Sequence, residues 1–128
     1  MTKRVVVLSG GISAEREVSL ASGKQCAAAL REAGYMVIPI EVGPDLAGLI
    51  ASLQQARADV VFNALHGRFG EDGCVQGVLD WLAIPYTHSG LRASSMAMDK
   101  VTAKLAFQAA GLPVPRHRLV TPEELAAA

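Results

Sequence analysis

VVVLSGGISAEREVS, residues 5–19, has the pattern of a strand, a tight turn and the start of a helix. Val5–Leu8 is a short apolar run of mainly β-branched residues, which is typical of a strand buried on both faces. Gly10 and Gly11 permit a sharp turn and the close approach of another group to the backbone. We expect a ligand-binding corner here, because ligands of open α/β sheets bind at the carboxyl ends of the strands.

The helix after this turn is predicted to span residues 14–33, with Ser13 as its N-cap and Gly34 as its stop. Its positive end would then point back at the tip of the strand. Its inward side is predicted from residues at helical spacing: Val18, Ala21, Gln25 or Cys26, Ala29, Leu30 and Ala33.

Glu15 lies in the first turn of this predicted helix and has two interpretations. It is either an acidic residue stabilised by the helix dipole or a group that binds a ligand. Because Glu15, Arg16 and Glu17 are consecutive, at least one of them must face the tip of the sheet, which favours a role in binding.

Length, charge and cysteine content restrict the class of protein. The 128 residues, 51% of them hydrophobic, suit one domain with its own core and argue against disorder. Twelve basic and twelve acidic residues cancel without a basic patch, so we expect no nucleic-acid partner. Two cysteines, no export signal and no membrane-spanning run predict a cytoplasmic protein without membrane association.

The rest of the chain alternates between apolar runs and turn signals. Pro39 removes one ladder donor, which places its strand at or near a sheet edge. The order of strands and helices, with short loops, predicts an α/β fold with a parallel sheet and right-handed crossovers. The predicted strands are 35–42, 59–65, 84–87 and, outside the first sheet, 117–120; the predicted helices are 46–56 capped by Asp45, 74–82 with Val75, Val78, Leu79 and Leu82 inward, 91–97, and 100–110 capped by Asp99 and stopped by Gly111.

The last residues form a helix start. Thr121 is a cap residue, Pro122 occupies the first helical position and Glu124 lies three residues after the cap. Only four residues follow, and so short a helix is marginal in water. We expect an N-terminal part of a longer protein, and the alternative is a frayed tail.

Several other residues have a chemical and a structural interpretation. Gly10 and Gly11 do not complete a dinucleotide fingerprint or a P-loop, which disfavours Glu41 as a ribose-binding acid. His66 ends a buried strand and enters a glycine-rich loop, so it either packs or binds a ligand. Lys100 would lie at the positive end of its helix, where a bound anion would offset an unfavourable charge; the alternative is a solvated lysine. No cysteine–histidine spacing predicts a zinc site.

Four stretches together resemble a known family: GGISAEREVS (10–19), ALHGRFGEDG (64–73), MDK (98–100) and GLPVP (111–115). In this order and spacing they resemble the N-terminal region of bacterial D-alanine–D-alanine ligases, ATP-grasp enzymes of peptidoglycan synthesis. The resemblance covers essentially the whole chain. It implies a Rossmann-like, pre-ATP-grasp substrate domain over residues 1–97 and the first part of the ATP-grasp central domain over residues 98–128.

The resemblance also implies a chemistry. In that family ATP phosphorylates the carboxylate of one D-alanine, and the amine of a second D-alanine attacks the acyl phosphate. Glu15 matches the acid that holds the ammonium of the first D-alanine, and His66 matches a histidine near the reacting carboxyl group. Val18 would line the same pocket, and Lys100 would contact the ATP phosphates. ATP and Mg²⁺ would serve the whole enzyme, with metal ligands outside this chain, so we expect residues 1–128 alone to be inactive.

Two alternative functions stay open, and one residue departs from the pattern of the family that the chain resembles. Another ATP-grasp carboxylate–amine ligase is disfavoured by EREVS and HGRFGEDG. A non-catalytic, receiver-like binding module is disfavoured because Ser9 and the two following glycines stand where a receiver places acids. His88 occupies a loop position where the family commonly has glycine. The family is commonly dimeric through this region, so the resemblance implies a homodimer, although no interface pattern independently predicts one.

Overall fold

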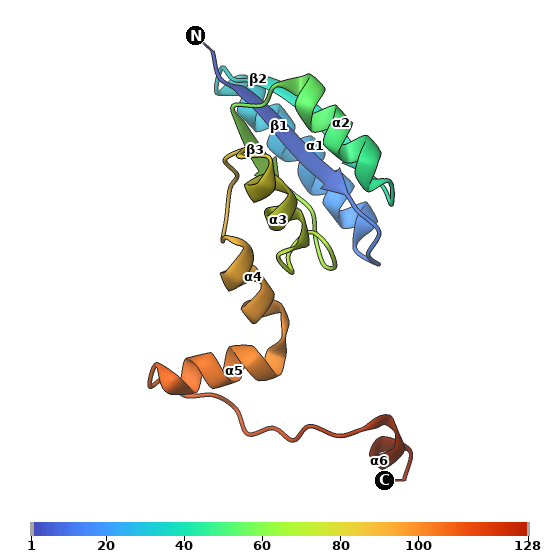
Figure 1. Cartoon of the computed structure of the whole chain (residues 1–128), viewed down its shortest axis with the longest axis vertical. Helices are drawn as coiled ribbons and strands as arrows, with labels where there is room; N and C mark the ends of the chain where they lie inside the picture. Colours follow the sequence, from blue (N-terminus) through green and yellow to red (C-terminus); the bar gives the residue numbers. More distant parts are fainter. Residues whose placement is uncertain (1, 128) are drawn as a thin grey trace.

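The computed structural model describes residues 2–127 and shows a parallel sheet with helices packed against it (Figure 1). Its strands are β1 (Arg4–Gly10), β2 (Met36–Val42) and β3 (Val60–Asn63). They lie in the order β2-β1-β3, and both neighbours of β1 run parallel to it. The predicted parallel α/β fold is therefore confirmed, with the opening strand at the centre of the sheet.

The helices follow the predicted order. Asp45 caps α2 by accepting a hydrogen bond from the Gly48 N–H at 3.0 Å, and Thr121 forms a capping box with Glu124, as predicted. The helices of the described residues are α1 (Arg16–Glu32), α2 (Leu46–Ala56), α3 (Cys74–Trp81), α4 (Leu91–Met98), α5 (Lys100–Ala109) and α6 (Pro122–Ala126).

The core lies on both faces of the sheet, because successive residues of β1 point in opposite directions. Val5 and Val7 pack with Ala27 of α1 on one face. The larger cluster on the other face joins the sheet to α2 and α3; its buried members are Val6, Leu8, Val42, Leu53, Val61, Leu65, Val75 and Leu79. The helices on both faces are those that the sequence predicted.

Two of the predicted strands, over residues 84–87 and 117–120, are not strands in the structure. Residues 84–87 form a single bridge, in which Val61 N–H donates to Pro85 O at 2.8 Å and Thr87 N–H donates to Val61 O at 3.0 Å. Left-handed residues on either side, Ala83 at φ 54° and His88 at φ 74°, turn the chain away from the sheet. The strand predicted over 117–120 is wrong: this exposed stretch has no regular structure and no strand beside it within the described residues.

The first helix begins later than predicted and buries only part of the predicted side. It starts at Arg16, not Ala14, and Glu15 occupies the N-cap position without a side-chain cap bond. The predicted inward face is right only in part: Leu30 packs against the core, but Val18 is 60% exposed, and the buried residues of the helix are Ser19, Gly23 and Ala27. The reason is the short distance between α1 and β1, since only small residues fit where the helix crosses the strand.

The carboxyl-terminal helices extend away from the sheet (Figure 1). Asp99 links α4 to α5 and caps α5, accepting from the Thr102 N–H at 2.6 Å, as predicted. The domain boundary that we predict between residues 97 and 98 falls in the last turn of α4 and stays a prediction. No helix within residues 2–127 has both the length and the apolarity needed to cross a bilayer.

Candidate functional site

The carboxyl end of β1 is a twin-glycine turn in which a side chain at Gly10 would be crowded. Gly10 and Gly11 both have left-handed backbones, at φ 93° and 85°. A Cβ at Gly10 would lie 2.8 Å from Arg16 Nη1 and 3.1 Å from Val42 O. Glycine is therefore required at this position by both backbone conformation and space.

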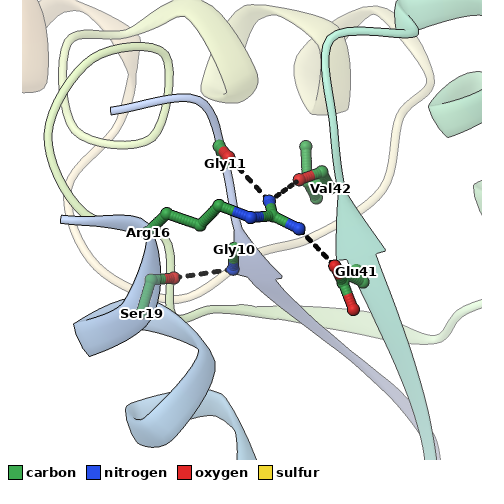
Figure 2. Close-up of polar contacts among 6 residues, drawn as sticks. All are labelled: Gly10, Gly11, Arg16, Ser19, Glu41 and Val42. Atoms are coloured by element: carbon green, nitrogen blue, oxygen red, sulfur yellow. Dashed lines mark hydrogen bonds and ion pairs between the residues drawn. The ribbon is translucent and has the colours of Figure 1, made fainter. Parts of the chain in front are cut away.

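Arg16 occupies the space that Gly10 leaves open (Figure 2). Its Nη1 donates to Gly11 O at 2.8 Å and to Val42 O at 3.0 Å, and its Nη2 pairs with the Glu41 carboxylate. One guanidinium thus joins the ends of β1 and β2 to the first turn of α1. Of the three consecutive charged residues, Arg16 is the one that faces the tip of the sheet, which the sequence did not single out.

Ser19 makes a second connection between the helix and the sheet. Its hydroxyl accepts from Gly10 N–H at 2.9 Å, shown in Figure 2, and donates to Ala64 O at 2.7 Å. The residue is fully buried. Its hydroxyl satisfies two backbone groups at the carboxyl ends of β1 and β3, so it fixes α1 against both.

Glu15 and His66 lie at the same corner, connected through Ser13. The Ser13 hydroxyl donates to His66 O at 2.8 Å and accepts from Glu15 N–H at 3.1 Å. The carboxylate of the exposed Glu15 lies beside Gly67, where an added Cβ would be 2.8 Å from Glu15 Oε2. Ser13, predicted to cap a helix, instead ties the segment before α1 to the loop after β3.

The other predicted site residues lie further out. Val18 is exposed on α1, one turn after the glycines. Lys100 is the exposed first residue of α5, beyond the α/β body (Figure 1). The structure thus brings the backbones of Glu15 and His66 together, with the His66 Nε2 3.2 Å from Ser22 Oγ of α1, and keeps Lys100 on a separate element. The chemical roles of all four residues stay predictions.

Two carboxylates shape the glycine-rich loop that follows β3. Glu71 accepts from Gly67 N–H at 2.6 Å, and Asp72 accepts from Phe69 N–H at 3.0 Å and from Cys74 N–H at 3.1 Å. Burial raises the pKa of Asp72, but the hydrogen bonds from Phe69 and Cys74 outweigh it and lower the pKa overall. Glu71 and Asp72 therefore stabilise the conformation of the loop between β3 and α3, in addition to preceding α3 in the chain.

A hollow of about 510 Å³ opens beside this loop. His66 and His88 both line it, and Glu15 does not. Asn63 and Gln76 form its polar floor, where both side-chain amides donate to Gly70 O, at 2.8 and 2.9 Å. Neither amide was predicted as a site residue, because neither belongs to the stretches that carry the family resemblance.

His88 adopts a conformation that favours glycine. Its φ is 74°, and its Nε2 lies 3.1 Å from Asn63 O. Its ring meets the ring of Phe62 edge-on, with centroids 5.7 Å apart. A left-handed backbone suits the glycine that the resemblance implies at this position, and the ring contacts show how this chain holds histidine there.

The central parallel strand, its twin-glycine turn and the helix that follows define a Rossmann-like α/β domain with a polar corner at the carboxyl ends of its strands. Residues 45–89 match the family described as D-ala D-ala ligase N-terminus. The D-alanine–D-alanine ligase of Granulibacter bethesdensis is 73% identical over 97% of this chain and 40% of that protein. That of Acidiphilium cryptum is 70% identical over 98% of this chain and 42% of that protein. Over nearly its whole length the chain is therefore similar to the N-terminal part of D-alanine–D-alanine ligases.

Solved structures agree with this similarity. The Bacillus anthracis D-alanine–D-alanine ligase complexed with ATP has a TM-score of 0.81 at 32% identity and covers 98% of this chain and 44% of its own. The D-alanyl-alanine synthetase A of Vibrio cholerae shares the fold, with a TM-score of 0.81 at 23% identity over 98% of this chain and 44% of its own. The present chain spans about 40% of the length of the curated relatives it matches.

Proposed function

We propose that this chain supplies the first-substrate corner of an ATP-dependent D-alanine–D-alanine ligase, which makes D-alanyl-D-alanine through an acyl phosphate for the bacterial cell wall. The observation that carries the proposal is the 73% identity to a protein of that name over 97% of the chain. The geometry supports it, because the Ser13 hydroxyl joins the backbones of Glu15 and His66 at the carboxyl end of the central strand.

Glu15 would pair with the ammonium group of the first D-alanine. Its carboxylate lies beside the Gly67 backbone and is exposed in this part of the protein. An exposed ion pair contributes at most about 1 kcal/mol, whereas breaking a buried pair costs about 3–5 kcal/mol. A strong grip on the ammonium therefore requires that other parts of the full-length protein exclude water from this corner. His66 would lie near the reacting carboxyl group, and Val18 would border the pocket.

The nucleotide would be held largely by residues outside this chain. Lys100, exposed at the start of α5, would contact the phosphates of ATP. Residues 2–127 contain no group of three or more His, Cys, Asp or Glu side chains close enough to hold a metal, and the Mg²⁺ that serves the reaction would be held by ligands outside this chain. Because most of the nucleotide site lies outside this chain, we expect residues 1–128 alone to produce no dipeptide. For the full-length protein we propose a cytoplasmic location and, from the resemblance, a homodimer.

The test is steady-state kinetics of the full-length protein with D-alanine and ATP, followed by ADP release and dipeptide formation. Glu15→Gln keeps the size of the side chain and removes its charge. It should raise the KM for the first D-alanine and lower kcat/KM by the equivalent of about 2–4 kcal/mol, since one charged pair in a covered site is lost. Glu17→Gln, in the first turn of the same helix, is the matched control and should leave the kinetics unchanged.

Each outcome has a distinct meaning. A wild-type protein without D-alanine-dependent ADP release contradicts the proposed reaction. An active wild type whose Glu15→Gln variant has unchanged kinetics removes Glu15 from the site and leaves the reaction in place. Turnover of another amino acid in preference to D-alanine would favour a different ATP-grasp ligase.

A further inference from the structure

Arg16 has more partners than a surface salt bridge requires. Its side chain is 35% exposed and reaches three acceptors: Gly11 O at 2.8 Å, Val42 O at 3.0 Å and the Glu41 carboxylate (Figure 2). These three acceptors lie at the carboxyl ends of β1 and β2, two neighbouring strands that α1 separates in the chain. The planar guanidinium suits this arrangement, because its donors diverge in a fixed fork.

The glycine turn is built around this side chain. A side chain at Gly10 would overlap Arg16 Nη1, with a Cβ only 2.8 Å away. Val42 O accepts from Arg16 and also from Gly11 N–H, at 2.9 Å. The same carbonyl therefore holds both the turn and the guanidinium, so a change at Arg16 is transmitted to the turn directly.

Arg16 and Ser13 anchor the segment that carries Glu15 from both sides. On one side, the Ser13 hydroxyl accepts from Glu15 N–H and donates to His66 O. On the other side, the residue next to Glu15 is fixed to the ends of β1 and β2. Glu15 itself makes no side-chain cap bond to its helix. The position of its carboxylate thus depends on the two anchored neighbours.

We propose that Arg16 is a positioning residue that fixes Glu15 for the first D-alanine; this rests on the proposed function. Without the guanidinium, Gly11 O, Val42 O and Glu41 each lose a partner, and residues 11–15 remain tied by the Gly11 N–H bond to Val42 O and by the bonds of Ser13. Displacing a binding group by about 1 Å can reduce rates on the order of 100-fold. We expect Arg16→Gln to raise the KM for the first D-alanine about 10- to 100-fold, with much smaller changes in the KM values for ATP and the second D-alanine.

The structure offers a matched control at the opposite end of the sheet. Arg4 pairs with Asp59 across β1 and the residue before β3, with Arg4 Nε 3.8 Å from Asp59 Oδ2. This pair also joins two neighbouring parallel segments through an arginine, but far from the twin-glycine turn. Arg4→Gln should leave all three KM values within about twofold of wild type.

Two further variants separate positioning from charge alone. Arg16→Lys keeps the charge and loses the fork, so it should restore only part of the first-substrate affinity. Glu41→Gln keeps an acceptor for Arg16 and should change the KM for the first D-alanine less than about threefold. Full rescue by lysine would show that charge alone matters and would overturn the proposal.

The experiment combines these kinetics with amide hydrogen exchange of the full-length variants. Arg16→Gln should speed exchange over residues 11–16, whereas Arg4→Gln should not. Equal first-substrate KM values for wild type and Arg16→Gln, with both proteins folded, would overturn the proposal. If the wild type proves not to be a ligase, the exchange result still decides whether Arg16 anchors the segment. If Arg16→Gln fails to fold, the same comparison is made with Arg16→Lys, where unchanged exchange and KM overturn the proposal.

Discussion

Gly23→Ala tests whether α1 approaches the sheet as closely as the structure indicates. Gly23 is buried in the middle of α1 and faces Ser9 of the central strand. An added Cβ would lie 2.4 Å from Ser9 Cβ and 2.7 Å from Ser9 Oγ. Atoms of this kind pack at about 3.5–4.0 Å, so helix and strand would have to separate by about 1 Å.

Two opposing effects set the size of the change. Alanine is preferred over glycine inside a helix by about 1 kcal/mol. Inserting a methyl group into a packed core costs about 1–3 kcal/mol. Ser9 Cβ is bonded to the backbone of the central strand, and no rotamer moves it away, so the cost lies toward the upper limit. The net result is a loss of about 1–2 kcal/mol in the free energy of unfolding.

The assay is urea denaturation of the 128-residue chain followed by far-ultraviolet circular dichroism. Fluorescence is a poor probe here, because Trp81 is 91% exposed. Gly43→Ala is the control, since nothing lies within 4 Å of the added Cβ, and its midpoint should match wild type or rise slightly.

A double-mutant cycle isolates the contact. Ser9→Gly removes the side chain that Gly23→Ala would strike, so the second substitution should cost less when the first is present. The coupling between contacting sites should be about 1–3 kcal/mol in favour of the double variant. A Gly23→Ala protein as stable as wild type, or a cycle without coupling, would refute the close approach of α1 to β1.

Two further substitutions test local features. His88→Ala and His88→Gly both lose the contact with Asn63 O, but only glycine tolerates φ 74° without strain, so the glycine variant should be the more stable by about 1 kcal/mol in the same denaturation assay. The hydrogen bond from Thr102 N–H lowers the pKa of Asp99 below its ordinary 3.8. The stabilisation of α5 by the charged Asp99 cap is therefore complete above pH 3.8 and is lost as the pH falls through the lower pKa of the folded state. Asp99→Asn keeps the cap but does not titrate, so its helical signal should fall less steeply than that of wild type in an acid titration.

Local signals in the sequence were enough to predict most of the fold. The apolar run Val5–Leu8 became the buried central strand, and Pro39 lies on the edge strand as predicted. Asp45 and Asp99 cap the helices assigned to them. Each of these features depends on residues close together in the chain, so the sequence contains the information directly.

The buried side of α1 could not be predicted in the same way. Hydrophobic periodicity gives most weight to large apolar residues and therefore selected Val18, which is exposed. The buried residues are Ser19, Gly23 and Ala27, because only small side chains fit in the short distance between helix and sheet. That distance is a property of the packed structure. Likewise, a bridge rather than a strand near Tyr86 follows from left-handed residues whose conformation the sequence did not reveal.

The corner around Glu15 depends on strand register, which explains why the sequence alone did not reveal the role of Arg16. The partners of Arg16 on β2 are 25 and 26 residues away in the chain. They meet the guanidinium because Ser9 pairs with Glu41 and Gly10 pairs with Val42 in the parallel ladder. A shift of one residue would move the side chain of residue 41 to the other face of the sheet and displace the Val42 carbonyl as well. The charged motif can therefore hold Glu15 in place only when β2 lies beside β1 in this register, so the geometry of the corner belongs to the sheet and not to the motif alone.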